Sequence, residues 1–334
     1  MSKSYLAQSR LQPVVTQNPF IEIMSNRTVS QIENLPDFKV QGLALPPGDW
    51  RRSVRNVVRR SVLDLLTSFS WLRGDFSQGG MAPVVQVINL HGVASSKLSD
   101  FGALIEKLKK RYEFISYSAA VDKIREGNID RNYATVTFDD GLRNHRDAAK
   151  VMRDHSVLGC FFITPAVIDL DPIRIPAYCR DVLRIQPTDF MNWDDLTRLL
   201  DLGHEVGSHT VTHPNMSTIT LDQAHYELVK SREVLTARLG QSRHFAWPLG
   251  KFSHFSPEVA QAVRNVGYES CASAERGSHA AHTDKNVNFC VRRDLVEVEW
   301  PTRHSEYFLL KSRRAPLKPT QTWPGEWLPK LNHH

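Results

Sequence analysis

The sequence has few of the features that define specialised protein classes. Its four cysteines form no Cys-x-x-Cys pair and lie far apart, at Cys160, Cys179, Cys271 and Cys290. This spacing argues against a disulfide framework or a zinc knuckle, so we expect reduced cysteines in the core. No apolar run approaches the length of a membrane span, and no uninterrupted apolar segment follows the first basic residues. We therefore expect a cytoplasmic protein.

An excess of charge of one sign is also nearly absent. The 42 lysines and arginines face 36 aspartates and glutamates, which gives a net charge of +6. This modest excess does not by itself indicate nucleic-acid binding, and we expect no nucleic-acid partner. With 41% hydrophobic and 23% charged residues, the composition is that of an ordinary globular protein. A length of 334 residues predicts one large domain with extensions, or two small domains.

The first 80 residues are expected to form an N-terminal extension. Residues 1–49 lack sustained periodicity, whereas residues 51–69 combine apolar side chains at helical spacing with five arginines before the first acid. This pattern predicts a basic amphipathic helix. Three interpretations of it stay open: packing on the rest of the protein, peripheral contact with an anionic membrane surface, and binding to nucleic acid.

From residue 84 onward, short apolar runs alternate with helical patterns, which indicates parallel βαβ units. The predicted strands are residues 84–90, 114–118, 134–138, 159–164, 204–209, 244–250 and 268–273. About seven such units favour a barrel over an open sheet. We assign residues 81–300 to this α/β domain and residues 301–334 to a Pro-rich C-terminal tail. The helix that begins near residue 98 is expected to be capped by Ser99.

Candidate chemistry lies where two predicted strands end. Ligands of parallel α/β proteins gather at the carboxyl ends of strands, and Asp139 and Asp140 directly follow the strand at 134–138. The same position after "HEVG" at 204–207 holds "SHTVTHP", which contains His209 and His213. If the chain turns helically there, a spacing of four brings both imidazoles within reach of one ion. Two histidines and one carboxylate form a typical catalytic set for zinc or another divalent ion.

A bound dication would also explain the adjacent carboxylates. Two neighbouring carboxylates normally repel each other, but an ion that takes one as a ligand leaves the second ionised and able to act as a base toward water. The alternative is that Asp139 and Asp140 form an ordinary turn before a glycine. Taken alone, the two histidines are equally compatible with a structural turn.

Two motifs resemble those of a known family. "TFDDG" at 137–141 and "SHTVTH" at 208–213 are similar to the first two motifs of NodB-type polysaccharide deacetylases, carbohydrate esterase family 4. The resemblance covers residues 84–300. It implies a distorted (β/α)7 barrel that removes N-acetyl groups from glycans. It further implies Asp139 as the general base, with Asp140, His209 and His213 as ligands of zinc or else cobalt, nickel or iron.

A third family motif is present, but it differs from the usual pattern. "FAWPLG" at 245–250 corresponds to the family motif that lines the acetyl site, which implies a substrate or oxyanion role for Trp247, Pro248 and Leu249. The arginine that the family carries two residues before the proline is Ala246 here. Arg292 or Arg293 could replace it, and the sequence does not choose between them.

The candidate for the family's general acid also occupies a different position in this sequence. The family's late "LxH" motif is missing, but "INLHGV" places His91 after the first strand. This resembles the circularly permuted exopolysaccharide deacetylases, which implies His91 as the general acid, with His304 as the alternative donor.

The predicted function is metal-dependent removal of N-acetyl groups from an amino-sugar-containing glycan or glycan precursor, as in exopolysaccharide biosynthesis. A cytoplasmic location favours a lipid-linked or nucleotide-linked precursor. A basic helix at 51–69 would suit a lipid-linked saccharide at the inner membrane face. Two alternatives stay open: hydrolysis of a formamide, cyclic amide or ester on the same scaffold, and a non-catalytic glycan-binding barrel.

Overall fold

The structure is a computed structural model that describes residues 63–65, 67–68, 81–284 and 287–331, all within one compact unit of residues 56–334. Most of the predicted helix at 51–69, and all of residues 1–49, lie outside these described residues; residues 63–65 and 67–68 are helical. In the described part, no helix combines the length and the hydropathy needed to cross a bilayer. All four cysteines are buried and free.

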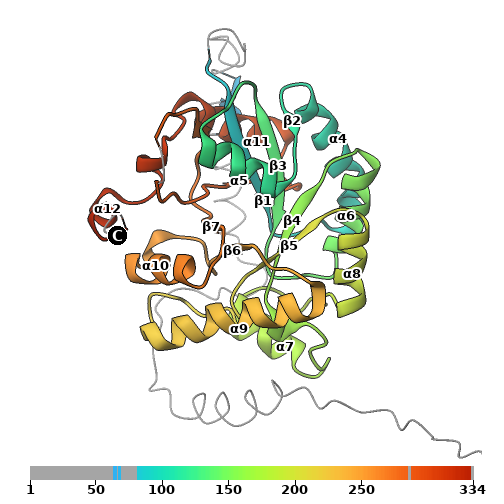
Figure 1. The fold of residues 1–334 in the computed structure, drawn as a ribbon. Helices are drawn as coiled ribbons and strands as arrows, with labels where there is room; N and C mark the ends of the chain where they lie inside the picture. Colours follow the sequence, from blue (N-terminus) through green and yellow to red (C-terminus); the bar gives the residue numbers. More distant parts are fainter. Residues whose placement is uncertain (1–62, 66, 69–80, 285–286, 332–334) are drawn as a thin grey trace, which may run out of the picture. The chain divides into compact units, whose positions relative to one another are not determined.

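The centre of the fold is a curled, mostly parallel sheet with the strand order β7-β6-β5-β4-β3-β1-β8 (Figure 1). The parallel strands are β1 (Val84–Leu90), β3 (Tyr133–Phe138), β4 (Gly159–Ile163), β5 (Glu205–Ser208), β6 (His244–Ala246) and β7 (Ser270–Ala272). The short strand β2 (Glu113–Phe114) pairs with β3, and β8 (His279–Ala280) runs antiparallel to β1. The sheet is therefore mixed, as a distorted barrel requires.

One late segment links the two edges of the curled sheet. Val291 forms a parallel bridge with Ala272 of β7, and β9 (Asp294–Leu295) pairs in parallel with β1. Residues 291–295 therefore span the gap between the last parallel strand and the first. This contact confirms the predicted (β/α) barrel and places residue 293 at its closing seam.

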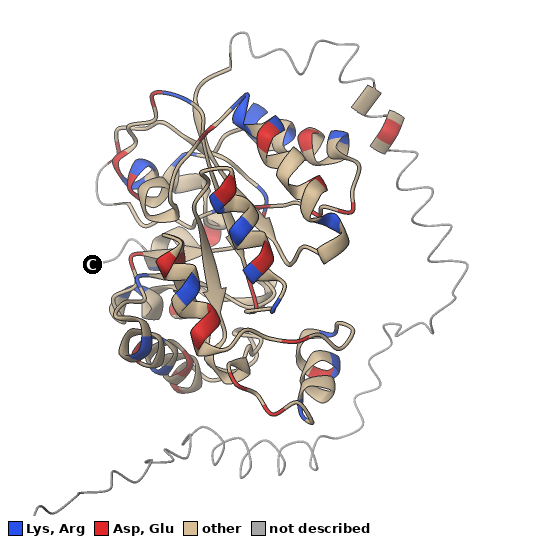
Figure 2. Ribbon diagram, turned by 90° about the vertical axis from the view of Figure 1, so that its right-hand side faces the viewer, with Lys and Arg blue, Asp and Glu red and all other residues tan. Residues whose placement is uncertain are grey.

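Helices cover the outside of the sheet in chain order (Figure 1). They are α4 (Leu98–Lys109), α6 (His145–Asp154), α8 (Trp193–Asp201), α9 (Leu221–Leu239) and α10 (Pro257–Asn265), and each contacts the next. The helices α11 (Thr302–Arg314) and α12 (Leu328–Leu331) lie against β1 and α10, while α7 (Ile175–Tyr178) belongs to an insertion. Figure 2 shows basic and acidic residues interspersed along these helices, in agreement with the small net charge.

Strand periodicity divides the core into two layers. Successive side chains of a strand point to opposite faces, so Val85 and Val87 enter the barrel, whereas Ile88 and Leu90 pack against the outer helices. Asn89 lies two residues after Val87 on β1, so its side chain points to the same face as the two inward valines. Its side chain therefore enters the carboxyl end of the barrel, where a buried polar group needs polar partners.

Several predictions about local structure were wrong. The strand predicted at 244–250 ends at Ala246. Residues 114–118 are not a strand, because the strand ends at Phe114 and the helix α5 (Tyr117–Glu126) follows at once. The Ser116 side chain accepts a hydrogen bond from the Ala119 N–H and so caps this helix, a local preference that outweighs the β-propensity of the segment. Helix α4 begins at Leu98, ahead of the expected cap at Ser99.

Candidate active site

Three ligand-type side chains converge at the carboxyl end of the barrel. Asp140 follows β3, and His209 and His213 follow β5. The Asp140 Oδ1 atom lies 3.2 Å from His213 Nε2 and 3.5 Å from His209 Nε2. One ligand atom from each of the three residues lies within 4.8 Å of the others, and both imidazoles are buried. Among the described residues, this is the one group of at least three such side chains arranged to hold a metal ion.

Contacts with backbone groups hold the His209 imidazole and the loop that joins the two histidines. His209 Nδ1 donates a hydrogen bond of 2.7 Å to the Ala246 carbonyl, which turns Nε2 toward Asp140. The loop between the histidines is fixed by the nearly buried Glu227 on α9, which accepts bonds from the N–H groups of Val211 and Thr212. The sequence did not predict this role of Glu227, because the residues that it binds lie 15 and 16 positions earlier in the chain and belong to a different element.

The backbone at this site adopts an unusual conformation. Asp140, Thr210 and His213 have φ angles of 75°, 65° and 62°, in the left-handed region that non-glycine residues rarely adopt. Residues 209–213 form no helical turn, so the assumption behind the predicted pairing of His209 and His213 was wrong. Left-handed residues bring the imidazoles together instead. Such conformations cost about 1–3 kcal/mol each and concentrate at functional sites.

Asp139 is held by a different set of partners. Arg293 donates to both carboxylate oxygens, with Nη1···Oδ1 at 2.7 Å and Nη2···Oδ2 at 2.9 Å. The amide of Asn89 donates to Asp139 Oδ2 at 3.1 Å. Of the two candidate arginines, Arg293 therefore occupies the place beside Asp139, whereas the Arg292 Nε atom donates to the Thr322 carbonyl.

The two carboxylates are held in their ionised forms by different partners. Burial acts to raise the pKa of Asp139, but the Arg293 guanidinium outweighs it and lowers that pKa below its ordinary value. Burial likewise acts to raise the pKa of Asp140, but His209 and His213 hold that pKa well below the usual range. Two ionised carboxylates can thus lie side by side because each has its own partners.

Buried polar groups beneath Asp139 fix its orientation. Asn89 Oδ1 accepts hydrogen bonds from Thr137 Oγ1 at 2.9 Å and from Arg293 Nη1 at 3.1 Å. Arg293 Nε donates to the Ser273 carbonyl at 2.6 Å. Asn89 and Thr137 were not singled out in the sequence. The alternation of inward residues along β1 and β3 would have placed both in the barrel interior beside Asp139.

His91 lies at the mouth of the same end. The strand register pairs Leu90 with Phe138, so the next residue on each strand, His91 and Asp139, stand level with each other. The His91 side chain is 51% exposed, and its Nδ1 lies 3.6 Å from a carboxylate oxygen of Glu297. Glu297 raises the pKa of His91 against the opposing effect of burial, and the two aspartates add to the rise. The charged imidazolium is therefore favoured at this position.

The remaining predicted residues lie in different surroundings. Trp247 has no exposed area and stacks on Phe255 with ring centroids 4.3 Å apart, so its indole packs in the core. Pro248 is buried, whereas Leu249 is 47% exposed with a left-handed φ of 64°. The alternative acid His304 lies on α11, where its Nε2 is 2.6 Å from Asp64 Oδ1.

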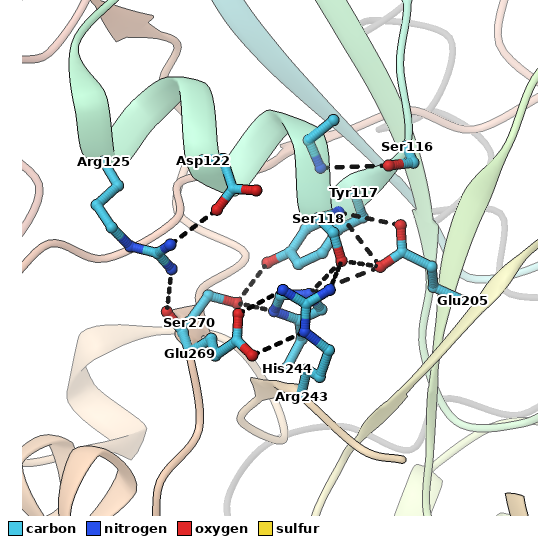
Figure 3. A network of polar contacts seen from close by, with 11 residues as sticks. Ser116, Tyr117, Ser118, Asp122, Arg125, Glu205, Arg243, His244, Glu269 and Ser270 are labelled. Carbon is cyan, nitrogen blue, oxygen red and sulfur yellow. Dashed lines mark hydrogen bonds and ion pairs between the residues drawn. The ribbon is translucent and has the colours of Figure 1, made fainter. Parts of the chain in front are cut away.

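A second cluster of histidine and carboxylate groups closes the opposite end of the barrel, where α5 meets the first residues of three strands (Figure 3). Ser118 Oγ lies 2.5 Å from Glu205 Oε2 and 2.8 Å from His244 Nε2. His244 Nδ1 lies 3.0 Å from Ser270 Oγ. Both imidazole nitrogens therefore have hydroxyl partners, and burial lowers the pKa of His244 to about 4.

Comparison with known sequences identifies relatives of the central part of the chain. A family model described as polysaccharide deacetylase matches residues 126–271. A peptidoglycan-N-acetylmuramic acid deacetylase of Bacillus subtilis is 26% identical over 148 residues, which cover 43% of this chain and 47% of the relative. A chitooligosaccharide deacetylase of Azorhizobium caulinodans is 25% identical over 137 residues, which cover 40% of this chain and 53% of the relative. The chain thus spans about half the length of these curated relatives.

Solved structures show the same fold. The deacetylase PplD of Streptococcus pyogenes, solved in complex with acetate, gives a TM-score of 0.54 at 13% identity over 69% of this chain and 98% of that one. IcaB of Ammonifex degensii gives the same TM-score at 17% identity over 70% and 98% of the two chains. At these identities the likeness is one of architecture.

Proposed function

We propose that the chain is a member of the NodB-type polysaccharide deacetylase family, and that it is a metal-dependent hydrolase that removes N-acetyl groups from an amino-sugar-containing glycan. The observation that carries the proposal is the separation of partners at the two adjacent carboxylates. Arg293 holds Asp139, while two imidazoles face Asp140. This arrangement supplies a base and a metal-binding group side by side.

The residues fit a divalent ion. Asp140, His209 and His213 offer one oxygen and two nitrogens, the donor set that suits zinc and also cobalt, nickel or iron. The hydrogen bond from His209 Nδ1 to the Ala246 carbonyl presents the other nitrogen as a ligand atom. An ion held there would polarise the acyl carbonyl and lower the pKa of a water molecule.

The protein side chains then handle two protons. Asp139, ionised beside Arg293, accepts a proton from the attacking water. Its Oδ1 accepts one hydrogen bond and keeps a lone pair for this, whereas its Oδ2 already accepts two. His91, whose protonated form Glu297 favours, donates a proton to the departing nitrogen as the carbon–nitrogen bond breaks. The products are acetate and a free amino sugar.

The test is acetate release from a panel of N-acetylated oligosaccharides, measured with the chelated enzyme and after reloading with zinc, cobalt, nickel or iron. We expect release only from the reloaded enzyme. N-formylated, cyclic-amide and O-acetylated substrates in the same panel test the alternative hydrolase functions. Oligosaccharide binding without hydrolysis of any substrate would instead support a non-catalytic glycan-binding barrel and contradict the proposal.

A lipid-linked substrate at the inner membrane face is a further part of the proposal, and it rests on the sequence of residues 51–69 alone. Arginines on one side and apolar residues on the other are the composition of helices that attach to anionic surfaces. Cosedimentation with vesicles containing anionic lipid tests this attachment. The full chain should pellet with the vesicles and a chain that lacks residues 1–75 should not; equal behaviour of both would contradict it.

A further inference from the structure

A cavity of about 370 Å³ lies next to the proposed active site. One side of the cavity is the start of α4, which comes after β1. The other side is residues 297–305, which come after β9. Both segments therefore lie at the carboxyl end of the barrel. Glu297 lines this cavity and also contacts His91, with 3.6 Å between the carboxylate oxygen and Nδ1. The cavity therefore adjoins the residue proposed to protonate the leaving amine.

The lining combines an aromatic ring with polar groups. Trp300 is half-buried in the wall, and its ring lies 5.7 Å from that of Phe308, which supports it from the adjoining helix. Ser305 is 1% exposed and lines the cavity. Its hydroxyl group can both donate and accept a hydrogen bond, as a polar molecule in the cavity would require.

The charges of the lining are unequal. Among the lining residues that the structure describes, Lys97 alone is a cation, and its Nζ lies 2.7 Å from Asp100. Glu297, which contacts His91, and Glu299 add two further carboxylates. A bound molecule that carries carboxylate, sulfate or phosphate groups would be repelled. A neutral or amine-bearing molecule would not.

We propose that this cavity is a subsite for the sugar ring next to the one that loses its acetyl group, selective for neutral or amine-bearing sugars over anionic ones. A sugar ring has an apolar face that can pack on an indole and hydroxyls that can bind carboxylates and Ser305. The volume lies within the range of ligand pockets, about 300–1,000 Å³. This inference rests on the proposed function, because a glycan must be the substrate.

The test is calorimetric titration with N-acetylglucosamine and with its β-1,4-linked and β-1,6-linked tetramers. The wild type should bind one tetramer at least about tenfold more tightly than the monomer, and Trp300→Ala should remove most of this preference. Trp193→Ala is the matched control, because Trp193 is equally half-buried but lies on α8 against Arg238. No preference in the wild type, or the same preference in Trp300→Ala, would overturn the subsite.

A second variant tests the charge selectivity without removing a packed ring. Glu299 is exposed, so Glu299→Gln removes one charge from the cavity wall at little risk to the fold. At low salt, it should improve binding of a sulfated tetramer about threefold relative to the neutral one. An unchanged ratio would contradict the selectivity.

Acetate release measured on the same samples separates this inference from the proposed function. Trp300-dependent binding of a tetramer without acetate release supports the subsite and contradicts the deacetylase activity. Acetate release with no dependence on Trp300 contradicts the subsite and leaves the activity standing.

Discussion

The two ends of the barrel contain the same kinds of side chain and use them differently. At the amino end, Ser118, Glu205, His244 and Ser270 satisfy one another's hydrogen bonds (Figure 3). At the carboxyl end, His209 and His213 turn their Nε2 atoms toward one carboxylate, and one ligand-type atom from each of the three residues lies within 4.8 Å of the others. Residue composition alone therefore does not identify a site; the direction of the ligand atoms does.

The backbone conformation also differs between the two ends of the barrel. Among the four residues of the amino-end cluster, none has a positive φ, whereas Asp140, Thr210 and His213 all do. A left-handed conformation is stabilised only when surrounding contacts enforce it. The amino end is thus built for stability and the carboxyl end for the placement of side chains, and the following predictions test that distinction.

The largest contrast is expected in catalysis. Asp139→Asn should lower kcat/KM by about 10²–10⁴-fold, because a general base contributes roughly that factor. Glu205→Gln makes the same chemical change at the amino end and should alter kcat/KM by less than about threefold. Steady-state acetate release measures both. Similar losses in the two variants would mean that the carboxylates act only through stability.

The second contrast concerns buried and exposed ion pairs. Arg293→Met leaves Asp139 buried without its partner and should lower the free energy of unfolding by about 3–5 kcal/mol. Arg243→Met breaks a pair with Glu269 in which both side chains are partly exposed, and should cost about 1 kcal/mol or less. Urea denaturation checks this. Equal losses would contradict the importance of burial at Asp139.

A third comparison identifies the general acid. His91→Gln should lower kcat/KM about 10²-fold, because its charged form faces the two aspartates. His304→Gln should change it by less than about threefold, because that imidazole is engaged with Asp64. The opposite order in acetate-release assays would assign the acid to His304.

The smallest effect is the pH dependence of stability at the amino end. The pKa of His244 is lowered from 6.5 to about 4 by burial, so below pH 6.5 the unfolded chain binds a proton that the folded chain does not. Stability from this group is complete above pH 6.5 and declines as pH falls toward 4. Between pH 7 and 5 the loss is about 2 kcal/mol. His244→Gln should show a correspondingly flatter pH dependence in denaturant titrations; an unchanged one would contradict the shifted pKa.

Local sequence was sufficient for the strands that carry the site. The strands before Asp139 and His209 were both predicted within one residue of their observed ends. The first two residues of α5 were assigned to a strand because "FISYS" is rich in β-formers. The capping Ser116 indicates a helix only when the residues that follow it are considered as well. The positions of the motif residues could thus be predicted, whereas one adjoining element could not.

The features of the site that the sequence did not predict depend on contacts and backbone conformations that appear only in the folded chain. Arg293 lies 154 residues from Asp139, and only the pairing of β9 with β1 decides that it, and not Arg292, enters the barrel. The approach of His209 and His213 depends on left-handed residues that no spacing rule reveals. Motifs therefore indicate which residues meet, and tertiary structure decides how they are held.

The most direct test of the account is the metal content of three proteins purified and loaded with zinc in parallel: the wild type, His209→Ala and His244→Ala. Both variants remove a buried histidine that contacts a carboxylate, at opposite ends of the barrel. The account predicts about one ion per chain in the wild type and in His244→Ala, and none in His209→Ala. A wild type that cannot be loaded, or equal metal content in the two variants, would contradict it.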